Sequence, residues 1–410
     1  MTSETVRRSI SRVVEAGNCS GCGACAEAFD GVEMALDGEG FLRPGAGPVS
    51  VELGMGPPPP AIPFEQFCPG VGVRSAPRRA SDDVLVGSSL GVWQGWATDP
   101  AIRQSGSSGG VLTAIADWLV GTGRKQIAVG VGSSDVNAIV TAVRVATTTV
   151  GVREMAGSRY APVGVASEPD AYRDDAVVVG KPCEVTAIRR RQEGRSDSPL
   201  LLSFFCAGVP SQAASVDLAE KLGLDTSRPL ASLRYRGDGW PGRFVARDAD
   251  GREGALSYEA SWGEHLGKRL QWRCKVCVDG VGDDADIVAA DYWQADERGF
   301  PVFGEAAGRS VVIAKTTRGL DTLLAARDAG VIELQPIEAS SVSSRQPYQV
   351  RRRVTLLGRL LGARLAGRPT PKYVGFGLLR WTLMDPLRTA HDGIGSWTRS
   401  RRFRQTVGRR

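Results

Sequence analysis

Four of the eight cysteines have a spacing that suits one metal site in the middle of the chain. Cys274 and Cys277 are three residues apart, and at a tight turn both sulfurs of such a pair can bind one metal atom or cluster. Cys183 and Cys206 lie far upstream, each at or just beyond the end of a hydrophobic run. We expect these four thiolates to close a single four-sulfur site.

The other four cysteines predict a second site near the N-terminus. Cys19, Cys22 and Cys25 are separated by two small residues each. Ferredoxins wrap a [4Fe–4S] cluster in this way, because small residues let the backbone bend around the cluster and direct its amides at the sulfides. Cys68 comes after 42 intervening residues and is followed by Pro69, as the fourth ligand of a ferredoxin usually is. Zinc is the alternative, but cysteines at these intervals crowd a tetrahedral zinc site.

Two glycine-rich loops could hold a cofactor. The first consists of Ser105, Gly106, Ser107, Ser108, Gly109 and Gly110, and the helical pattern of Val111–Leu119 follows it. A loop that opens a helix exposes backbone amides at the positive end of the helix dipole, which suits a phosphate or pyrophosphate. It matches neither the Walker A pattern nor the Rossmann fingerprint, and a plain turn is the alternative.

The second glycine-rich loop is Arg234–Gly242. It has two arginines and two aromatic residues that could stack against a planar cofactor, and a surface turn is the alternative.

The hydrophobic runs predict the elements that position these residues. Ala176–Val179 and Leu200–Phe205 precede Cys183 and Cys206, and both are typical of buried strands followed by helices. If the two strands are parallel neighbours, their carboxyl ends share the sheet edge where open α/β sheets bind ligands. Further strands are expected at 127–131 and 139–146, which form a hairpin, and at 286–293 and 311–314; Gly54–Pro60 is expected to be a loop.

Composition and charge limit the classes of function. The chain has 410 residues and a net charge of +6, but residues 351–410 carry 15 Lys and Arg against two Asp, a surplus of about +13. No stretch is apolar enough for long enough to span a bilayer, and residues 1–17 lack the apolar segment of a secretory signal. We therefore expect a cytoplasmic protein whose cysteines are reduced thiols. The chain has only two histidines, His265 and His391, which are too few for a metal site built mainly from histidine.

The basic C-terminal tail predicts a surface contact. Val354, Leu357, Leu361 and Leu365 fall near one stripe of a helix, and Leu356 and Leu360 widen it. The remaining positions are rich in arginine. Basic helices with aromatic residues commonly lie on anionic membrane surfaces. We expect weak, salt-sensitive contact with an anionic membrane on its inner face, or with an acidic partner, and no nucleic acid. A helical hairpin that packs on the core is the alternative.

In this order, the motifs resemble those of the coenzyme F-420 hydrogenase/dehydrogenase beta-subunit family, to which 7-hydroxymethyl chlorophyll a reductase is similar. The resemblance covers residues 15–320 approximately. It rests on the loop 105–110, Gly180–Cys183, Cys206–Ser211, Cys274-x-x-Cys277-x-Asp279, Ala285–Ile287 and Asp291–Trp293. Two positions depart from the usual pattern of the family: Glu184, where glutamine is usual, and Ala290, where glycine is usual.

The resemblance implies an iron–sulfur flavoprotein oxidoreductase that holds FAD and two [4Fe–4S] clusters. Such a protein exchanges electrons with a deazaflavin (coenzyme F-420), a ferredoxin, a partner subunit or an organic substrate. The loop 105–110 would hold the FAD phosphates, and Lys181 would lie near the flavin, where its charge stabilises the reduced anion. Lys181 and His265 are the candidate catalytic residues, with His265 as a general acid.

We therefore expect a mixed α/β fold with a central mixed sheet and flanking helices. Residues 1–80 would form a ferredoxin-like [4Fe–4S] segment and residues 81–165 the N-terminal flavin-binding domain of the family. Residues 166–335 would form its C-terminal domain with the second cluster, and residues 336–410 a basic, partly amphipathic helical tail. The alternative is a non-enzymatic zinc protein with two four-cysteine sites and a basic, nucleic-acid-binding tail.

Overall fold

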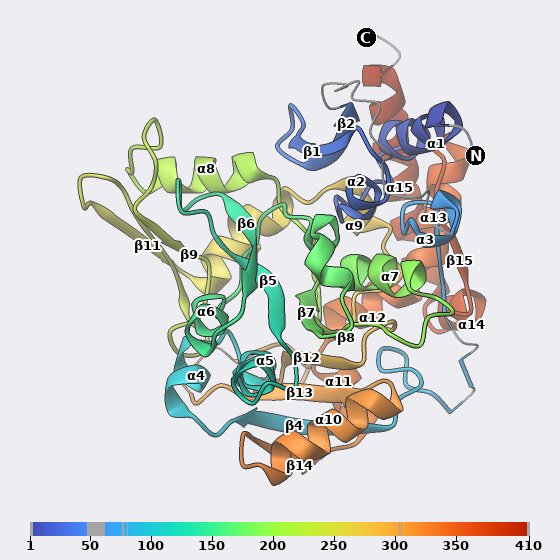
Figure 1. Ribbon diagram of the computed structural model, residues 1–410. Helices are drawn as coiled ribbons and strands as arrows, with labels where there is room; N and C mark the ends of the chain where they lie inside the picture. The colour runs from blue at the N-terminus through green and yellow to red at the C-terminus, as the bar shows by residue number, and fades with distance from the viewer. Residues whose placement is uncertain are drawn as a thin grey trace.

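The computed structural model describes residues 3–46, 62–75, 78–79, 81–302, 304 and 306–407, so the predicted loop Gly54–Pro60 lies outside it. Eight strands form its central sheet: β4 (Gly91–Ala97), β5 (Ile127–Ser133), β6 (Thr141–Ala146), β7 (Ala176–Gly180), β8 (Leu200–Phe204), β12 (Ile287–Asp291), β13 (Ser310–Ala314) and β14 (Ile332–Pro336). Their order is β14-β4-β13-β12-β8-β7-β5-β6 (Figure 1). The expected mixed sheet is confirmed, including the β5–β6 hairpin, whose second strand begins at Thr141 instead of Ile139.

Flanking helices cover both faces of this sheet. They are α4 (Pro100–Ser105), α5 (Val111–Gly121), α6 (Thr149–Glu154), α7 (Pro182–Arg191) and α10 (Thr317–Asp328), with 3-10 turns at Val165–Ser167 and Pro169–Tyr172. Successive residues of a strand point to opposite faces. Val177 therefore packs with Ile115 of α5 and Leu323 of α10, whereas Val178 packs with Ile188 of α7.

The strand directions bring the functional loops to one edge of the sheet. β5, β7, β8 and β12 are parallel, and β4 runs the same way because both β4 and β12 are antiparallel to β13. The expectation that the strands before Cys183 and Cys206 are parallel neighbours is confirmed by the pairing of Val178 with Leu201. The loop 105–110 follows β4 by way of α4, so it too lies beyond the carboxyl ends of the strands.

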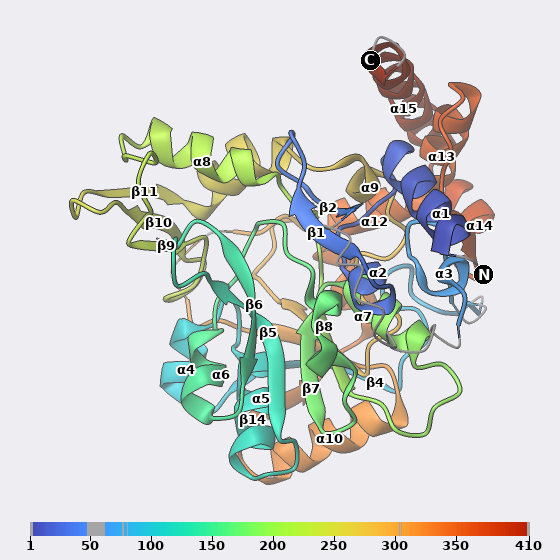
Figure 2. The same ribbon diagram turned by 45° about the horizontal axis from the view of Figure 1, so that its top comes forward.

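A smaller antiparallel sheet stands at one side of the central sheet (Figure 2). It consists of β9 (Ser232–Arg234), β10 (Arg243–Arg247) and β11 (Glu253–Ser257), with α8 (Gln212–Lys221), a π-helical turn (Ala260–His265) and a 3-10 turn (Leu266–Lys268) beside it. Tyr235 and Phe244, both fully buried, form its core with Leu218 of α8. This unit carries the glycine-rich loop Arg234–Gly242.

The N-terminal segment and the C-terminal tail lie side by side at the opposite end (Figures 1 and 2). The segment contains α1 (Ser3–Glu15), α2 (Ala24–Ala28), β1 (Val32–Leu36), β2 (Leu42–Ala46), α3 (Phe64–Phe67) and β3 (Gly72–Arg74), and the short α9 (Trp272–Lys275) lies near it. The tail contains α11 (Ala339–Ser344), α12 (Pro347–Val354), α13 (Leu356–Leu365), β15 (Lys372–Val374), α14 (Leu378–Thr382) and α15 (Pro386–Val407). β15 pairs in parallel with β3, so the two ends of the chain share a small sheet.

The predicted apolar stripe of the tail is not one helical face. The helix is interrupted at Thr355, so Val354 ends α12, and Leu361 and Leu365 belong to α13. Leu361 is 48% exposed and Leu365 is 81% exposed, while the core-facing side of α13 carries Leu356. Within the described residues, none of the helices has both the length and the apolar character needed to cross a membrane.

Candidate functional site

The four N-terminal cysteines line one small cavity. Cys19, Cys22, Cys25 and Cys68 all face it, together with apolar side chains of α1 and α3. The chain can wrap around this cavity because Gly21 has a φ of 72°, a left-handed conformation that glycine adopts without strain. The N–H of Gly21 donates to the sulfur of Cys19 over 3.4 Å. An amide directed at a cysteine sulfur is a feature that tunes iron–sulfur clusters.

The second group of cysteines is assembled from three segments. Cys183 lies in the first turn of α7, Cys206 follows β8, and Cys274 and Cys277 lie in and just after α9. The N–H of Val209, close behind Cys206, donates to the sulfur of Cys274 over 3.3 Å. Burial raises the pKa of Cys206 to about 12, and the thiols of Cys274 and Cys277 add to the rise while Arg352 opposes it. The structure thus places Cys206 close to Cys274 and Cys277.

The two cysteine groups are neighbours. Burial is the main cause of the raised pKa of Cys183, and among the charged groups that add to it is Cys22 of the first group. The buried side chain of Gln271 also joins the groups, because its amide N–H donates to the carbonyl of Ser20 over 3.1 Å. Gln271 in turn accepts a hydrogen bond from Arg43, which also donates to the carbonyl of Cys19 over 3.2 Å.

Neither group has the geometry of a site for a single metal ion. Across the described residues, no three His, Cys, Asp or Glu side chains converge closely enough to hold one ion. A four-cysteine zinc site needs four sulfurs around one atom at about 2.3 Å. An iron–sulfur cluster distributes its four cysteines over several iron atoms. A four-iron cluster therefore needs its four sulfurs farther apart than a zinc ion does.

Lys181 lies between β7 and α7, next to the second cysteine group. It is 8% exposed, and its ammonium donates to Glu184 over 2.5 Å and to the carbonyl of Val163 over 2.9 Å. Burial lowers the pKa of Lys181, but Glu184 outweighs it together with the thiols of Cys183 and Cys206, so the pKa is raised. The carboxylate of Glu184 also accepts the N–H groups of Lys181 and Val165. Lys181 is therefore a buried, ion-paired lysine and not an exposed loop residue.

The loop 105–110 is firmly built into the sheet edge. The N–H of Gly109 donates to the hydroxyl of Ser310 over 3.0 Å, and its carbonyl accepts from Ala97. Gly110 has a φ of 72° and caps α5, whose first turn leaves backbone amides without intrahelical acceptors. A Cβ on Gly109 would lie 2.6 Å from the carbonyl of Gly95, so this glycine is required by packing alone.

A large cleft of about 1580 Å³ opens beside this loop. The loop Arg234–Gly242 forms one wall, and Gln104, directly before Ser105, lies in another. The two glycine-rich loops touch, since Nη1 of Arg234 donates to the carbonyl of Ser105 over 3.4 Å, and the N–H of Gly239 donates to the neighbouring carbonyl of Gln104 over 2.8 Å. The remaining walls include Ser133 at the carboxyl end of β5, Tyr258 and Ala306.

The loop Arg234–Gly242, which forms one wall of the cleft, contributes one residue of a buried ion pair. Arg236 is 4% exposed, and its guanidinium binds both carboxylate oxygens of Asp291, at 2.6 and 2.8 Å. The ring of Tyr258 lies 4.6 Å from the same guanidinium. Burial lowers the pKa of Arg236, but Asp291 above all raises it beyond its usual value. The sequence placed Asp291 at a strand end and Arg236 in a loop, but gave no sign that they pair.

His265 is not brought to this cleft. It ends the π-helical turn beside β11, is partly exposed, and is not among the residues that line the cleft. The prediction that His265 acts as a general acid has no geometric support in the part of the chain that the structure describes.

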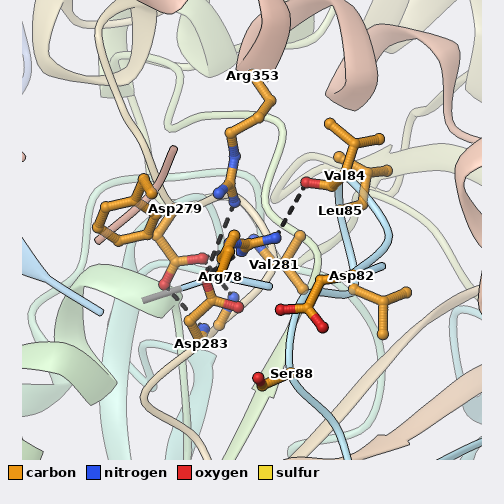
Figure 3. Close-up of polar contacts among 12 residues, drawn as sticks. Arg78, Asp82, Val84, Leu85, Ser88, Asp279, Val281, Asp283 and Arg353 are labelled. Carbon is orange, nitrogen blue, oxygen red and sulfur yellow. Dashed lines mark hydrogen bonds and ion pairs between the residues drawn. The ribbon is translucent and has the colours of Figure 1, made fainter. Parts of the chain in front are cut away.

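A cluster of buried charges fixes the loop after Cys277 (Figure 3). Asp279 accepts hydrogen bonds from the N–H groups of Val281, Gly282 and Asp283. Asp283 is in contact with Arg78 at 2.7 Å, Lys315 at 2.8 Å and Arg353 at 3.9 Å. Burial raises the pKa of Asp283, but these three cations together lower it well below its usual value. The carbonyl of Asp279 accepts the thiol of Cys277 over 3.2 Å, so the charge cluster lies directly beside this cysteine.

Comparisons with known proteins identify the family of this chain. Two models of the family described as "Coenzyme F420 hydrogenase/dehydrogenase, beta subunit" match the chain, the N-terminal model over residues 92–168 and the C-terminal model over residues 174–340. The F420-reducing [NiFe] hydrogenase complex from Methanosarcina barkeri, solved with xenon derivatization, includes a chain with 21% identity and a TM-score of 0.48, over 67% of this chain and 95% of that one. A search of curated proteins finds no significant match. Because the two family matches together span more than half of its residues, the chain belongs to the coenzyme F420 hydrogenase/dehydrogenase beta-subunit family.

Proposed function

We propose that this oxidoreductase is an iron–sulfur flavoprotein with two [4Fe–4S] clusters and FAD. It would pass electrons between a deazaflavin (coenzyme F420) or a ferredoxin and a partner subunit or organic substrate. The observation that carries the proposal is the assembly of all eight cysteines into two adjoining groups at the sheet edge where the loop 105–110 and the large cleft also lie. Bound there, flavin exchanges two electrons with a hydride donor and single electrons with clusters.

The surroundings of the cysteines fit anionic clusters. Cysteine ligands are thiolates, and buried thiolates need compensating positive charge and hydrogen-bond donors. Lys181 and Arg352 lie beside the second group, and Arg43 lies beside the first. Arg273 is buried between the groups, and its Nε and Nη1 lack a hydrogen-bond partner among the described residues. In the proposed holoprotein, Cys19, Cys22, Cys25 and Cys68 bind one cluster, and Cys183, Cys206, Cys274 and Cys277 bind the other.

The loop 105–110 and the cleft are the proposed flavin site. The first turn of α5 offers amides to a phosphate, and the cleft that begins at Gln104 has room for the rest of a dinucleotide. Lys181, beside the second cysteine group, would stabilise the reduced flavin anion with its positive charge. Its ammonium is held by Glu184 and Val163, so it supplies a fixed charge and not a mobile proton carrier. His265 is left without a role.

The tail supports a proposal about location. Apolar side chains on α13, α14 and α15 are exposed, among them Leu365 (81%), Leu379 (68%) and Leu387 (85%), as is Leu383 (71%) just after α14. Exposed arginines such as Arg401 accompany them on α15. Apolar side chains with nearby arginines suit the interface of an anionic membrane. We therefore keep peripheral contact with such a membrane as part of the proposal.

An anaerobic absorption spectrum with iron, zinc and FAD analysis tests the function. The expected protein is brown, carries iron and FAD, and loses its flavin bands when it is reduced. Addition of reduced coenzyme F420 or of reduced ferredoxin, in separate samples, then distinguishes the electron donors. A colourless protein with stoichiometric zinc would contradict the proposal and restore the zinc alternative, which family membership does not favour.

A further inference from the structure

Arg273 reaches both cysteine groups at once. In the sequence it directly precedes Cys274 of the second group. In space its Nη2 donates over 3.0 Å to the carbonyl of Pro69, the residue after Cys68 of the first group. Its side chain is 2% exposed. The guanidinium is therefore a buried cation that spans the boundary between the two groups.

Two of its three nitrogens lack the acceptors that a buried cation requires. Nε and Nη1 have no hydrogen-bond partner among the described residues, although both are shielded from solvent. The ring of Tyr373, 5.8 Å from the guanidinium carbon, offers only a cation–π contact. Leaving a charged donor buried and unpaired costs at least a few kcal/mol, so the fold is completed by an acceptor at this position.

The electrostatics indicate the kind of acceptor. Burial lowers the pKa of Arg273, but Tyr373 and the thiols of Cys277, Cys183 and Cys274 raise it above its ordinary value. Arg273 also lowers the pKa of Cys19, in the other group, although burial of that thiol dominates. Cysteines of both groups thus interact with one guanidinium, and thiolate sulfur is an anionic acceptor that both groups can supply.

We propose that Arg273 donates Nε–H and Nη1–H to sulfur atoms of the two clusters and so raises the reduction potential of both. This inference rests on the proposed function, because it requires a cluster in each cysteine group. A nearby positive charge and hydrogen bonds to sulfur stabilise the more negative, reduced form of a cluster. When one electron passes between the bound clusters, one would be oxidised as the other is reduced, and Arg273 would stabilise the added negative charge on whichever cluster receives the electron.

Two other arginines provide matched controls, because each contacts only one group. Arg43 donates to the carbonyl of Cys19 and contacts the first group. Arg352 donates to the carbonyls of Cys206 and Cys274 and contacts the second group. If position between the groups is what matters, only Arg273 affects both potentials.

Redox titration followed by EPR, on the anaerobically purified full chain, measures the two midpoint potentials in each variant. Arg273→Gln is expected to lower both potentials, Arg43→Gln only the first, and Arg352→Gln only the second. The variant Cys22→Ser, which is expected to lose mainly the first cluster, assigns the signals, because the signal that it keeps belongs to the second group. Full iron content with one or both potentials unchanged in Arg273→Gln would overturn the inference.

A second substitution covers the case in which Arg273→Gln loses iron. Arg273→Lys keeps the charge but not the planar fork of donors, so it is expected to lower both potentials by less than glutamine would. Unchanged potentials at either cluster of Arg273→Lys would also overturn the inference. A wild-type chain that holds no iron–sulfur cluster would instead contradict the proposed function, so the two failures are distinguishable.

Discussion

The guanidinium of Arg352 donates to the backbone carbonyl of Cys206 over 3.0 Å, which ties the C-terminal tail to the second cysteine group. The same side chain donates to the carbonyl of Cys274, and Gln349 also donates to Cys206, over 3.1 Å. Both residues lie in α12, beyond the family match that ends at residue 340. The tail is therefore part of the site as well as a surface element.

We expect Arg352→Gln to weaken iron binding at the second cysteine group. The change removes two charge-assisted hydrogen bonds, each of which contributes about 1.5–3 kcal/mol, and leaves two carbonyls near the cysteines with fewer donors. Iron content after desalting and thermal unfolding of the anaerobic protein measure the effect. Arg388→Gln is the control, since Arg388 pairs with the partly exposed Asp385 at 3.7 Å and is remote from the cysteines in sequence. Equal iron in both variants would mean that α12 does not support the site.

Much of this arrangement could be predicted from the sequence, because the signals were local. The strands before Cys183 and Cys206 are short apolar runs with glycine or cysteine at their ends, and parallel pairing then fixes the shared edge. The adjacency of the two cysteine groups depends on long-range contacts such as the one between Gln271 and Ser20, which no local pattern reports.

The contacts of the C-terminal tail also could not be predicted from its sequence. Its surplus of positive charge suggested a surface function, yet several of its arginines are used inside the protein. Arg353 is 3% exposed beside Asp283, and Arg359 pairs with Asp392 at 2.6 Å. A count of charges cannot distinguish an arginine that binds carbonyls and carboxylates from one that faces solvent. The interruption of the helix at Thr355 was likewise invisible in the apolar spacing.

Substitution of one cysteine in each group should have different consequences. Cys274→Ser is expected to reduce both folding and FAD content, because its group joins three distant segments of the chain. Cys22→Ser is expected to remove mainly the first cluster, whose cysteines come from a peripheral segment. Iron and FAD analysis of each purified variant, with circular dichroism as the measure of folding, checks this. Loss of all iron and FAD from Cys22→Ser would show that the two sites are not independent.

A negative charge in the loop 105–110 should displace flavin before iron. Gly109 is unsuitable for this test, because its Cβ would collide with the carbonyl of Gly95 whatever the ligand. Ser107 is partly exposed and its hydroxyl accepts from Ser158 over 2.8 Å, so it can be changed with less strain. Ser107→Asp is expected to lose FAD while it keeps its iron, since a carboxylate repels phosphate. Ser107→Ala is the control, and normal FAD occupancy in Ser107→Asp would mean that the loop is an ordinary turn.

Asp283 should be a major determinant of stability. Asp283→Asn would leave three buried cations without their carboxylate, and breaking a buried ion pair costs about 3–5 kcal/mol. Because the cations lower the folded-state pKa of Asp283, its contribution is fully present above the unfolded pKa of about 4 and is lost as the pH falls through the folded pKa. Chemical denaturation at pH 7 and at pH 3 measures both effects.

The exposed pair of Asp197 and Arg195 provides the control for Asp283. Both side chains are more than half exposed, and exposed pairs contribute at most about 1 kcal/mol. Asp197→Asn should therefore change the free energy of unfolding little at either pH. A similar small change in Asp283→Asn would mean that water reaches the buried cluster and screens it.

The outward faces of the tail should bind anionic membranes weakly. Deleting the tail cannot test this, since its removal would also remove Arg352 from the second cysteine group. Point changes at exposed positions separate the two roles: Leu383→Glu with Leu387→Glu removes apolar contact, and Arg401→Glu reverses one charge.

Each basic residue near an anionic surface contributes about 1 kcal/mol to membrane binding, and salt screens this contribution. The wild-type chain should therefore sediment with anionic vesicles at low salt but not at high salt, and the variants should sediment less at low salt. Val136→Glu, an exposed apolar position far from the tail in sequence, is the control and should bind as the wild type does. Equal, negligible sedimentation of all these proteins would leave the tail with its packing role at the second cysteine group.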